Sequence, residues 1–217
     1  MKIGILGSGD VARTLGSGFL ATGHDVKLGA RKAGNPKLVE WAKQGGPHAS
    51  QGTFSDAAQF GDLIVVSTLG VATAEAVRAA GLPAFRGKLV IDTTNPLRFS
   101  AQGPPSLAIG LTTSAGEELQ QLLPQAHVVK AFNIIGSPHM FRPSFPNGPP
   151  DMWICGNDAA AKEKVKGILK EFGWSSVIDL GGIENSRELE SLCVLWVKSA
   201  LVLGTWNVGF RLLRRGS

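Results

Sequence analysis

Two glycines near the start of the chain stand where a backbone can approach a phosphate closely. They belong to a G-x-G-x-x-A pattern, Gly7-Ser8-Gly9-Asp10-Val11-Ala12. Gly7 permits a tight turn, Gly9 has no Cβ to hold a pyrophosphate away, and Ala12 is small enough for a helix to pack closely on a sheet. The N-terminus of that helix would stabilise a bound anion. The pattern predicts a dinucleotide site; a purely structural glycine-rich turn is the alternative.

The next charged residues bear on which dinucleotide binds. Arg31 follows Ala30 and stands 22 residues after Gly9, where an NAD site carries Asp or Glu on the ribose diol. A guanidinium can instead hydrogen-bond a 2′-phosphate and stack on adenine. Lys32 and Lys37 add positive charge. The segment therefore predicts that Ala30, Arg31 and Lys32 contact NADP(H), with a solvated charge cluster on a loop as the alternative.

Three further segments that follow apolar runs carry small or polar residues. Ligands of a doubly wound sheet lie beyond the carboxyl ends of its strands, so these segments are predicted to meet the nicotinamide half. Hydroxyl and amide groups there offer donors and acceptors to the ribose and carboxamide, and a small residue lets the ring lie against it. Each polar residue has a turn or cap role as its alternative, since Asn-Pro is itself a turn signal. The predicted contacts are Thr68, Leu69, Asn95, Pro96, Ala131 and Asn133.

The inventory of reactive side chains is sparse. The sequence has no tyrosine, which excludes mechanisms that depend on a tyrosine acid. Its two cysteines, Cys155 and Cys193, lie in apolar runs outside any CxxC or Cys/His cluster. We therefore expect no metal site. Free buried thiols are typical of a reducing, cytoplasmic setting.

Short apolar segments alternate with helical patterns over the first 133 residues. Strands are expected at Lys2–Leu6, Asp25–Ala30, Asp62–Thr68, Lys88–Thr93 and His127–Phe132. Helices are expected at Val11–Ala21, Lys37–Lys43, Ala72–Ala80 and Ser114–Leu123, the last with a Ser114-x-x-Glu117 capping box. Apolar strands that alternate with helices indicate a parallel sheet covered on both faces. The prediction is a doubly wound, Rossmann-type α/β fold.

The remaining residues are predicted to form a small α/β extension. We expect residues 1–133 to be the NADP-binding domain and residues 134–217 to complete the acceptor site. The proline-rich segment Asn133–Pro150 is either an ordinary connection or a wall over a substrate. After it we expect the elements Met152–Cys155, Asp158–Phe172, Ser176–Leu180 and a long C-terminal helix, Ser186–Trp206. That helix carries more apolar surface than one sheet face can cover, which predicts a homodimer.

Length and charge limit the remaining possibilities. A chain of 217 residues predicts one domain or one domain with a small appendage. The net charge of +5 is modest and sits partly in Arg211, Arg214 and Arg215, so no nucleic-acid partner is expected. The longest apolar stretch, Leu192–Leu203, is interrupted by Lys198, and no membrane partner is expected. The chain opens with no apparent targeting segment.

Six short motifs of the chain carry a resemblance to a known family: Lys2–Gly9, Gly29–Arg31, Val128–Asn133, Cys155–Asp158, Asp179–Gly181 and Asn185–Glu190. Together they resemble the NADP oxidoreductases that use a reduced 8-hydroxy-5-deazaflavin coenzyme, factor 420. They are similar also to the NADPH-binding domain of membrane-bound ferric and cupric reductases. The resemblance implies hydride transfer between NADPH and a small-molecule deazaflavin or flavin-like acceptor. The sequence differs from the archaeal deazaflavin enzymes near the expected acceptor site, where Leu69-Gly70-Val71 lacks their Pro and nearby His.

Hydride transfer to such a ring makes a delocalised anion that solvent can protonate. The protein must then stack two rings and exclude water, so no catalytic side chain is predicted; His139 is the one histidine placed to reach an acceptor. Two alternatives remain open. One is an NADPH-binding sensor or partner-binding module without turnover. The other is a small hydroxyacid or imine dehydrogenase-like reductase, whose catalytic Lys with Asn four residues later is not matched, because Val202 follows Lys198 at that spacing.

Overall fold

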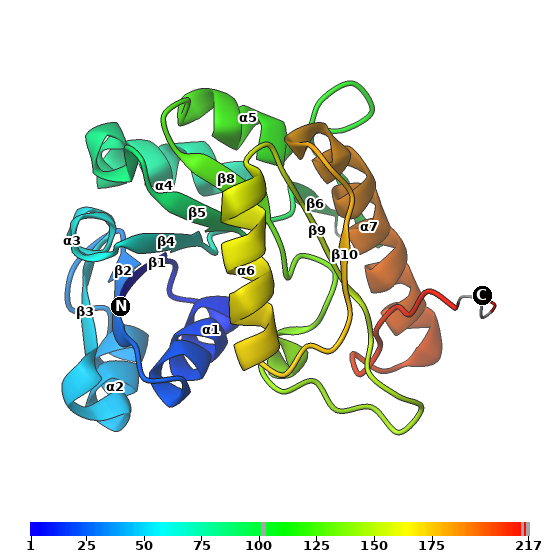
Figure 1. Ribbon diagram of the computed structural model, residues 1–217, viewed down its shortest axis with the longest axis horizontal. Coiled ribbons are helices and arrows are strands. Elements are labelled where there is room, and N and C mark those ends of the chain that lie inside the picture. The colour runs from blue at the N-terminus through cyan, green and yellow to red at the C-terminus, as the bar shows by residue number, and fades with distance from the viewer. Residues whose placement is uncertain (101–102, 214, 216–217) are drawn as a thin grey trace.

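The computed structural model describes residues 1–100, 103–213 and 215 and is drawn as a ribbon in Figure 1. Arg214 and residues 216–217 of the predicted extension lie outside the described residues. The main-sheet strands are β1 Lys2–Leu6, β2 Asp25–Ala30, β3 Ala49–Thr53, β4 Leu63–Val66, β5 Leu89–Asp92, β8 His127–Lys130, β9 Met152–Gly156 and β10 Val177–Asp179. The helices are α1 Asp10–Ala21, α2 Pro36–Gly45, α3 Phe54–Phe60, α4 Thr73–Ala80, α5 Ala115–Leu122, α6 Ala159–Glu171 and α7 Ser186–Leu203. Short 3₁₀ turns occupy Gly46–His48, Gly70–Ala72, Leu82–Phe85, Ser137–His139 and Ile183–Asn185.

One mixed sheet organises the described chain. Its strand order is β10-β9-β8-β5-β4-β1-β2-β3. Every neighbouring pair is parallel except β8 and β9, which run antiparallel. A parallel pair needs a crossover, usually a helix, and the connection from β8 to β9 contains only the 3₁₀ turn Ser137–His139. The doubly wound α/β prediction is confirmed, with this one reversal.

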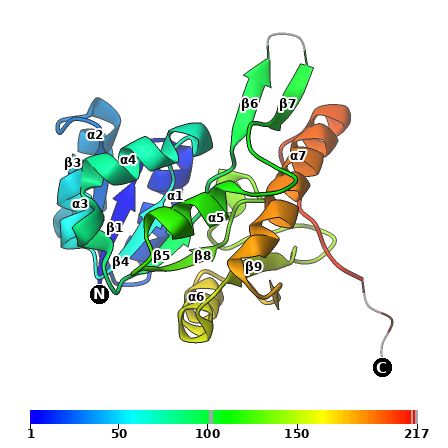
Figure 2. The same cartoon turned by 90° about the horizontal axis from the view of Figure 1, so that it is seen from above.

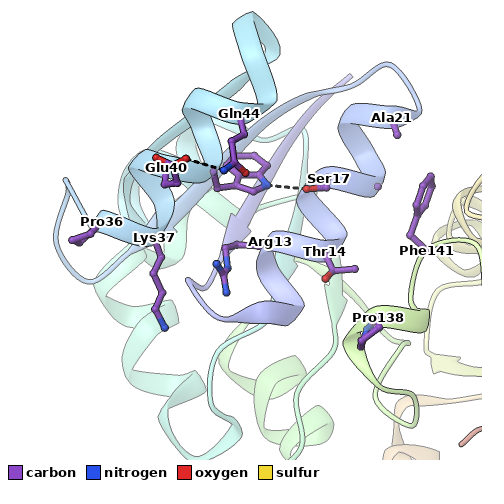
Figure 3. A pocket seen from close by; sticks show the side chains of 12 residues that line it. Arg13, Thr14, Ser17, Ala21, Pro36, Lys37, Glu40, Gln44, Pro138 and Phe141 are labelled. Carbon is purple, nitrogen blue, oxygen red and sulfur yellow. Dashed lines mark hydrogen bonds between the residues drawn. The ribbon is translucent and has the colours of Figure 1, made fainter. Parts of the chain in front are cut away.

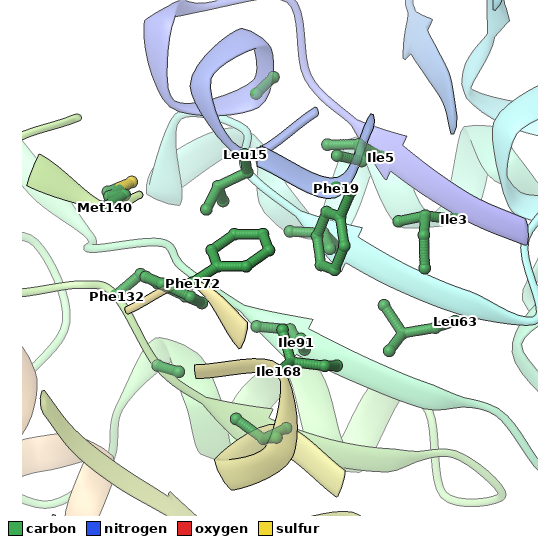
Figure 4. Close-up of a cluster of buried hydrophobic side chains, with 14 of the residues drawn as sticks. Ile3, Ile5, Leu15, Phe19, Leu63, Ile91, Phe132, Met140, Ile168 and Phe172 are labelled. Carbon is green, nitrogen blue, oxygen red and sulfur yellow. The ribbon is translucent and has the colours of Figure 1, made fainter. Parts of the chain in front are cut away.

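Helices cover both faces of the sheet, and the central strands β4 and β5 are therefore buried on both sides. Alternate side chains of β4 enter opposite cores. Val65 belongs to the core that also contains residues of α1, α2 and α6, and Ile64 belongs to the core that contains residues of α3, α4 and α5. In the first core the Phe19 and Phe172 rings meet edge to face with centroids 4.8 Å apart (Figure 4). These two layers fix the carboxyl ends of β1, β2, β4, β5 and β8 along one edge.

Four elements, three strands and one helix, were not predicted from the sequence pattern. It did not predict β3 or α3, because Ala49–Thr53 has no apolar alternation. It also missed an antiparallel hairpin, β6 Leu97–Ser100 and β7 Gly103–Leu107, which projects from the body (Figure 2). The long C-terminal helix ends at Leu203 rather than Trp206, since Gly204 adopts a left-handed conformation with φ 66°. Within the described residues, no helix combines the length and apolar character that crossing a bilayer requires.

Candidate nucleotide-binding site

The turn between β1 and α1 is built around two glycines with different surroundings. The Gly7 amide donates to the Gly29 carbonyl over 2.9 Å, and a Cβ on Gly7 would lie 2.6 Å from the Ser67 carbonyl oxygen. Only glycine therefore allows β1 to turn this close to the end of β4. A Cβ on Gly9 would have no heavy atom within 4 Å. Gly9 thus leaves open space at the start of α1, where the first-turn N–H groups lack helical partners.

A cavity of about 760 Å³ opens at this turn. Its walls are the β1–α1 turn, the loop after β2, the end of β4, Phe54 and one side of α4. Ligand sites commonly measure about 300–1,000 Å³, so the space suits a large part of a dinucleotide. Of the residues predicted from sequence, the cavity brings together Gly7, Ser8, Gly9, Ala30, Arg31, Lys32, Thr68 and Leu69.

The loop after β2 forms the positively charged wall of the cavity. Arg31 and Lys32 are exposed. Gly34 donates its N–H to the Gln51 side chain over 3.1 Å, and the Asn35 side chain accepts from the Lys37 amide at the start of α2. The loop is therefore tied to β3 and α2 on either side. This wall places cations where the sequence predicted a 2′-phosphate.

Several cavity residues were missed by sequence reasoning. Three alanines of the α4 region, Ala72, Ala76 and Ala79, form a wall of small side chains, and Phe54 stands at the start of α3. The alanines recur at i, i+4 and i+7, a spacing that puts them on one helix face. That spacing is a signal that could have identified the wall. Glu75 also lines the cavity.

Seven other predicted residues are not in the cavity wall, and four of these lie in α1 or directly after β8. Asp10 is exposed and pairs with Arg13 in the first turn of α1. Val11 packs against the core, and Ala12 and Ala131 are fully buried in it. The side chain of Ala131 therefore offers no exposed surface to a ring.

Two asparagines pair at the ends of β5 and β8. Asn95 Nδ2 donates to the Asn133 carbonyl over 2.8 Å, and Asn133 Nδ2 donates to Asn95 Oδ1 over 2.9 Å. Asn133 Nδ2 also donates to the Leu189 carbonyl of α7 over 2.9 Å. Pro96 is buried directly after Asn95. Segments 38 residues apart in sequence are thus joined at the carboxyl edge of the sheet.

The end of β4 connects this asparagine pair to the cavity. Thr68 Oγ1 lies 3.0 Å from Thr73 Oγ1, and Leu69 is 59% exposed. A Cβ on the next residue, Gly70, would lie 1.9 Å from the Asn95 carbonyl oxygen. The chain that lines the cavity at Thr68 and Leu69 therefore presses directly on the Asn95–Pro96 turn.

Comparison with known proteins places the chain in a family. Residues 2–96 match the family described as NADP oxidoreductase, coenzyme F420-dependent. A crystal structure from Arthrobacter sp. FB24, assigned as an F420-dependent NADP reductase, has 37% identity and a TM-score of 0.92, and the match covers 99% of this chain and 100% of that one. This chain belongs to the F420-dependent NADP oxidoreductase family.

Two curated relatives show the breadth of this family. The F420-dependent NADP reductase of Methanocaldococcus jannaschii is 28% identical over 222 residues, which is 98% of each chain. Metalloreductase STEAP3 of Rattus norvegicus is 30% identical over 192 residues, covering 88% of this chain and 36% of that protein. The chain thus spans about a third of the length of the metalloreductases it matches. The resemblance inferred from the motifs is confirmed.

In this F420-dependent oxidoreductase family member, the proline-rich segment lines a different space. A groove of about 920 Å³ runs between α1 and α2 (Figure 3). Pro138 and Phe141 form its far wall, and Trp41 donates to Ser17 Oγ over 3.0 Å within it. Pro36 lines both this groove and the nucleotide cavity. The proline-rich segment therefore lies against α1 and forms one wall of this groove.

His139 lies in the same segment. Its Nε2 is 3.0 Å from Asn207 Oδ1, and its ring packs on Phe145 with centroids 4.5 Å apart. It is not among the cavity-lining residues. Its contacts are those of a packing residue that ties the loop to the C-terminal tail.

Proposed function

We propose that this protein transfers a hydride between NADPH and a deazaflavin or flavin-like small molecule. The observation that carries the proposal is the cavity at the Gly7–Gly9 turn, whose wall after β2 presents Arg31 and Lys32 where an NAD site has an acid. The family to which the chain belongs supports it. F420-dependent NADP reductases are among the relatives that it matches over nearly its whole length.

The proposed placement of the cofactor follows the cavity from end to end. The pyrophosphate lies on the turn Gly7-Ser8-Gly9 and at the start of α1, where Asp10 and Val11 follow the turn and the buried Ala12 supports it from the core. The 2′-phosphate lies on Arg31 and Lys32, beside Ala30, and the adenine lies between Arg31 and the α4 alanines. The nicotinamide half passes Thr68 and Leu69 toward Asn95 and Pro96, with Asn133 beneath. Ala131 supports that strand end from within the core.

The acceptor is proposed to lie beside the end of β4. Leu69 and Val71 are 59% and 53% exposed next to the cavity, and exposed apolar side chains at a binding site suit a planar ring. We propose that residues 134–217 complete this acceptor site. Stacking of two rings and exclusion of water are then the tasks of the protein, and no side chain acts as acid.

A spectrophotometric panel tests this function. The protein is mixed with NADPH and, in turn, a deazaflavin, FMN, FAD and ferric chelates, and the near-ultraviolet absorbance of NADPH is followed. Turnover with a deazaflavin or flavin is expected. Tight binding without turnover across the panel would instead support a sensor, and turnover only with imines or carbonyls would support a dehydrogenase-like reductase.

We also propose that the protein is a cytoplasmic homodimer whose interface includes the C-terminal half of α7. Leu201, Val202 and Leu203 are 52%, 86% and 65% exposed, and Trp206 after the helix is 54% exposed. Contiguous exposed apolar surface marks interaction sites. Sedimentation at micromolar concentration is expected to give twice the chain mass of 22.8 kDa; a species of the single-chain mass would reject the dimer.

A further inference from the structure

A closed ring of hydrogen bonds, completed by one ion pair, joins the ends of β5 and β8 to α7. Lys130 Nζ, at the end of β8, donates to the Thr94 carbonyl over 2.8 Å. The next residue, Asn95, pairs with Asn133 in both directions, and Asn133 donates to the Leu189 carbonyl. Glu190 follows Leu189 and closes the ring, with Oε1 2.8 Å from Lys130 Nζ.

The ring is anchored by buried charges. The side chains of Lys130 and Asp92 are fully buried, and that of Glu190 is 1% exposed. Asp92 Oδ2 lies 2.9 Å from Lys130 Nζ, and Asp92 Oδ1 accepts from the Thr94 amide over 2.9 Å. Three oxygens therefore lie within 2.9 Å of Lys130 Nζ: the Thr94 carbonyl, which accepts a hydrogen bond, and carboxylate oxygens of Asp92 and Glu190, which form ion pairs.

The N-terminus of α5 completes the partners of Glu190. The Ala115 and Gly116 amides donate to its two carboxylate oxygens, each over 3.0 Å. Gly116 is needed for this approach, because a Cβ there would lie 2.3 Å from Ser186 Oγ and 3.0 Å from Lys130 Cε. Burial raises the pKa of Glu190 although Lys130 opposes the shift. Burial lowers the pKa of Lys130, but Asp92 and Glu190 outweigh it and raise that pKa above its ordinary value.

Two features occur together at the Asn133 end of the ring, although Thr94 Oγ1 and Asp92 Oδ2 at the β5 end also lack a hydrogen-bond partner among the described residues. Phe132 is buried at φ 65°, a conformation that costs a bulky residue energy and that clusters at functional sites. Asn133 is 4% exposed, and its Oδ1 has no hydrogen-bond partner among the described residues. A buried acceptor without a partner destabilises the fold, because it has given up its hydrogen bonds to water. The strained backbone of Phe132 and the unpaired Oδ1 of Asn133 therefore lie side by side after β8.

The ring touches the cavity through Gly70. That glycine packs on the Asn95 carbonyl, and the residue before it, Leu69, lines the cavity. A shift of Asn95 would therefore move the end of β4. The six residues of the ring and Asp92 lie in sequence segments outside the Gly7–Gly9 turn.

We propose that Lys130 and Glu190 are positioning residues that fix the nicotinamide end of the bound cofactor through Thr94, Asn95 and Asn133. This inference rests on the proposed function. Neither charge touches the cofactor; the ring holds the Asn95–Pro96 turn against the end of β4 and so sets where the nicotinamide ring lies. The adenine end of the cavity does not contact the ring, and its binding is independent of it.

Substitution Glu190→Gln tests this separation, because it removes one charge at nearly constant volume. Binding of NADPH and of 2′,5′-ADP, a fragment without nicotinamide, is measured by calorimetry, and turnover with saturating acceptor gives kcat. We expect the Kd of 2′,5′-ADP to stay within about twofold and that of NADPH to rise roughly two- to tenfold. Misplacement of the reacting ring lowers kcat by about ten- to a hundredfold.

The matched control is Glu117→Gln, which breaks another ion pair between α5 and α7. Glu117 accepts from Arg187 Nε over 2.8 Å and is outside the ring. It is expected to leave kcat and both Kd values within about twofold. If Glu190→Gln fails to fold, the double substitution Lys130→Met with Glu190→Leu removes the ion pair that closes the ring without touching the cofactor. Apolar replacement of both partners of a buried ion pair is often neutral for stability, and this variant is expected to give the same pattern.

Unchanged kcat and an unchanged ratio of the NADPH and 2′,5′-ADP Kd values in a folded ring variant would overturn the proposal. An equal loss of NADPH and 2′,5′-ADP binding would also overturn it, since that is the result of a general structural role. If the wild type binds NADPH but reduces no acceptor, the proposed function fails, while the ratio of the two Kd values still decides whether the ring positions the nicotinamide.

Discussion

The two ends of the nucleotide cavity are built in opposite ways. At the β2 end, Arg31 and Lys32 are exposed on a loop held by a few peripheral hydrogen bonds. Toward the β5 and β8 ends, Lys130, Glu190 and Asn133 are buried and joined across four elements. Removal of an exposed charge does not disturb the core, whereas removal of a buried charge leaves its buried partners unpaired. We therefore assign the proposed affinity for NADPH and the choice between NADPH and NADH to the Arg31 end, and the proposed placement of the nicotinamide ring to the Lys130 end.

The largest expected effect is on stability, from Lys130→Met. The substitution leaves Asp92 and Glu190 buried without a cation, and breaking such a cluster costs about 3–5 kcal/mol. Chemical denaturation should show that loss of unfolding free energy. Arg31→Met, which removes a cation at the exposed end, is the matched control and should unfold within about 0.5 kcal/mol of wild type. A similar loss of unfolding free energy in both variants would contradict the proposed difference between the two ends.

The next effect is on cofactor choice, from Arg31→Ala. A charge-assisted hydrogen bond contributes about 1.5–3 kcal/mol, so NADPH affinity should fall about 10- to 150-fold. NADH affinity should barely change, because NADH has no 2′-phosphate. Titration of both cofactors into both proteins measures the preference. Equal affinities for NADPH and NADH in the wild type would contradict the assignment of this end.

A smaller effect is expected from His139→Ala. The histidine packs on Phe145 and contacts Asn207, so its loss should loosen the proline-rich segment and lower kcat by less than about tenfold. A general acid contributes about 10²–10⁴-fold. A hundredfold loss of kcat at unchanged NADPH affinity would show acid catalysis and point to a carbonyl or imine acceptor.

The smallest effect concerns the pH dependence of stability at the Glu117–Arg187 pair. The hydrogen bond from Arg187 holds the pKa of Glu117 below its usual value of 4.5. The stabilisation is therefore present above that unfolded-state value and is lost as the pH falls through the lower folded-state pKa. For a partly exposed pair it amounts to about 0.2–1 kcal/mol. Glu117→Gln should remove this part of the acid dependence in denaturation curves measured from neutral to acid pH; an unchanged slope would contradict it.

Local patterns were sufficient for much of the fold and for one end of the cavity. The residues of β1 and β2 and the Gly7–Gly9 turn follow from apolar runs and glycine spacing, and Arg31 needs only its place after a strand. Asn95 and Asn133 were expected at strand ends for the same reason. These features depend only on residues that are neighbours in the sequence, so they can be predicted from it.

The tertiary structure alone decided which distant residues meet. Lys130 and Glu190 are 60 residues apart, and nothing local in either segment indicates that one neutralises the other. The edge strand β3 escaped prediction because an edge strand needs no apolar pattern, and β9 runs antiparallel because no helix crosses back before it. The α4 wall became part of the cavity only through packing on the sheet. Burial and charge pairing are properties of the assembled layers, so the pairing of Lys130 with Glu190 could not be predicted from the sequence, whereas the position of Arg31 and Lys32 beside the glycine turn could.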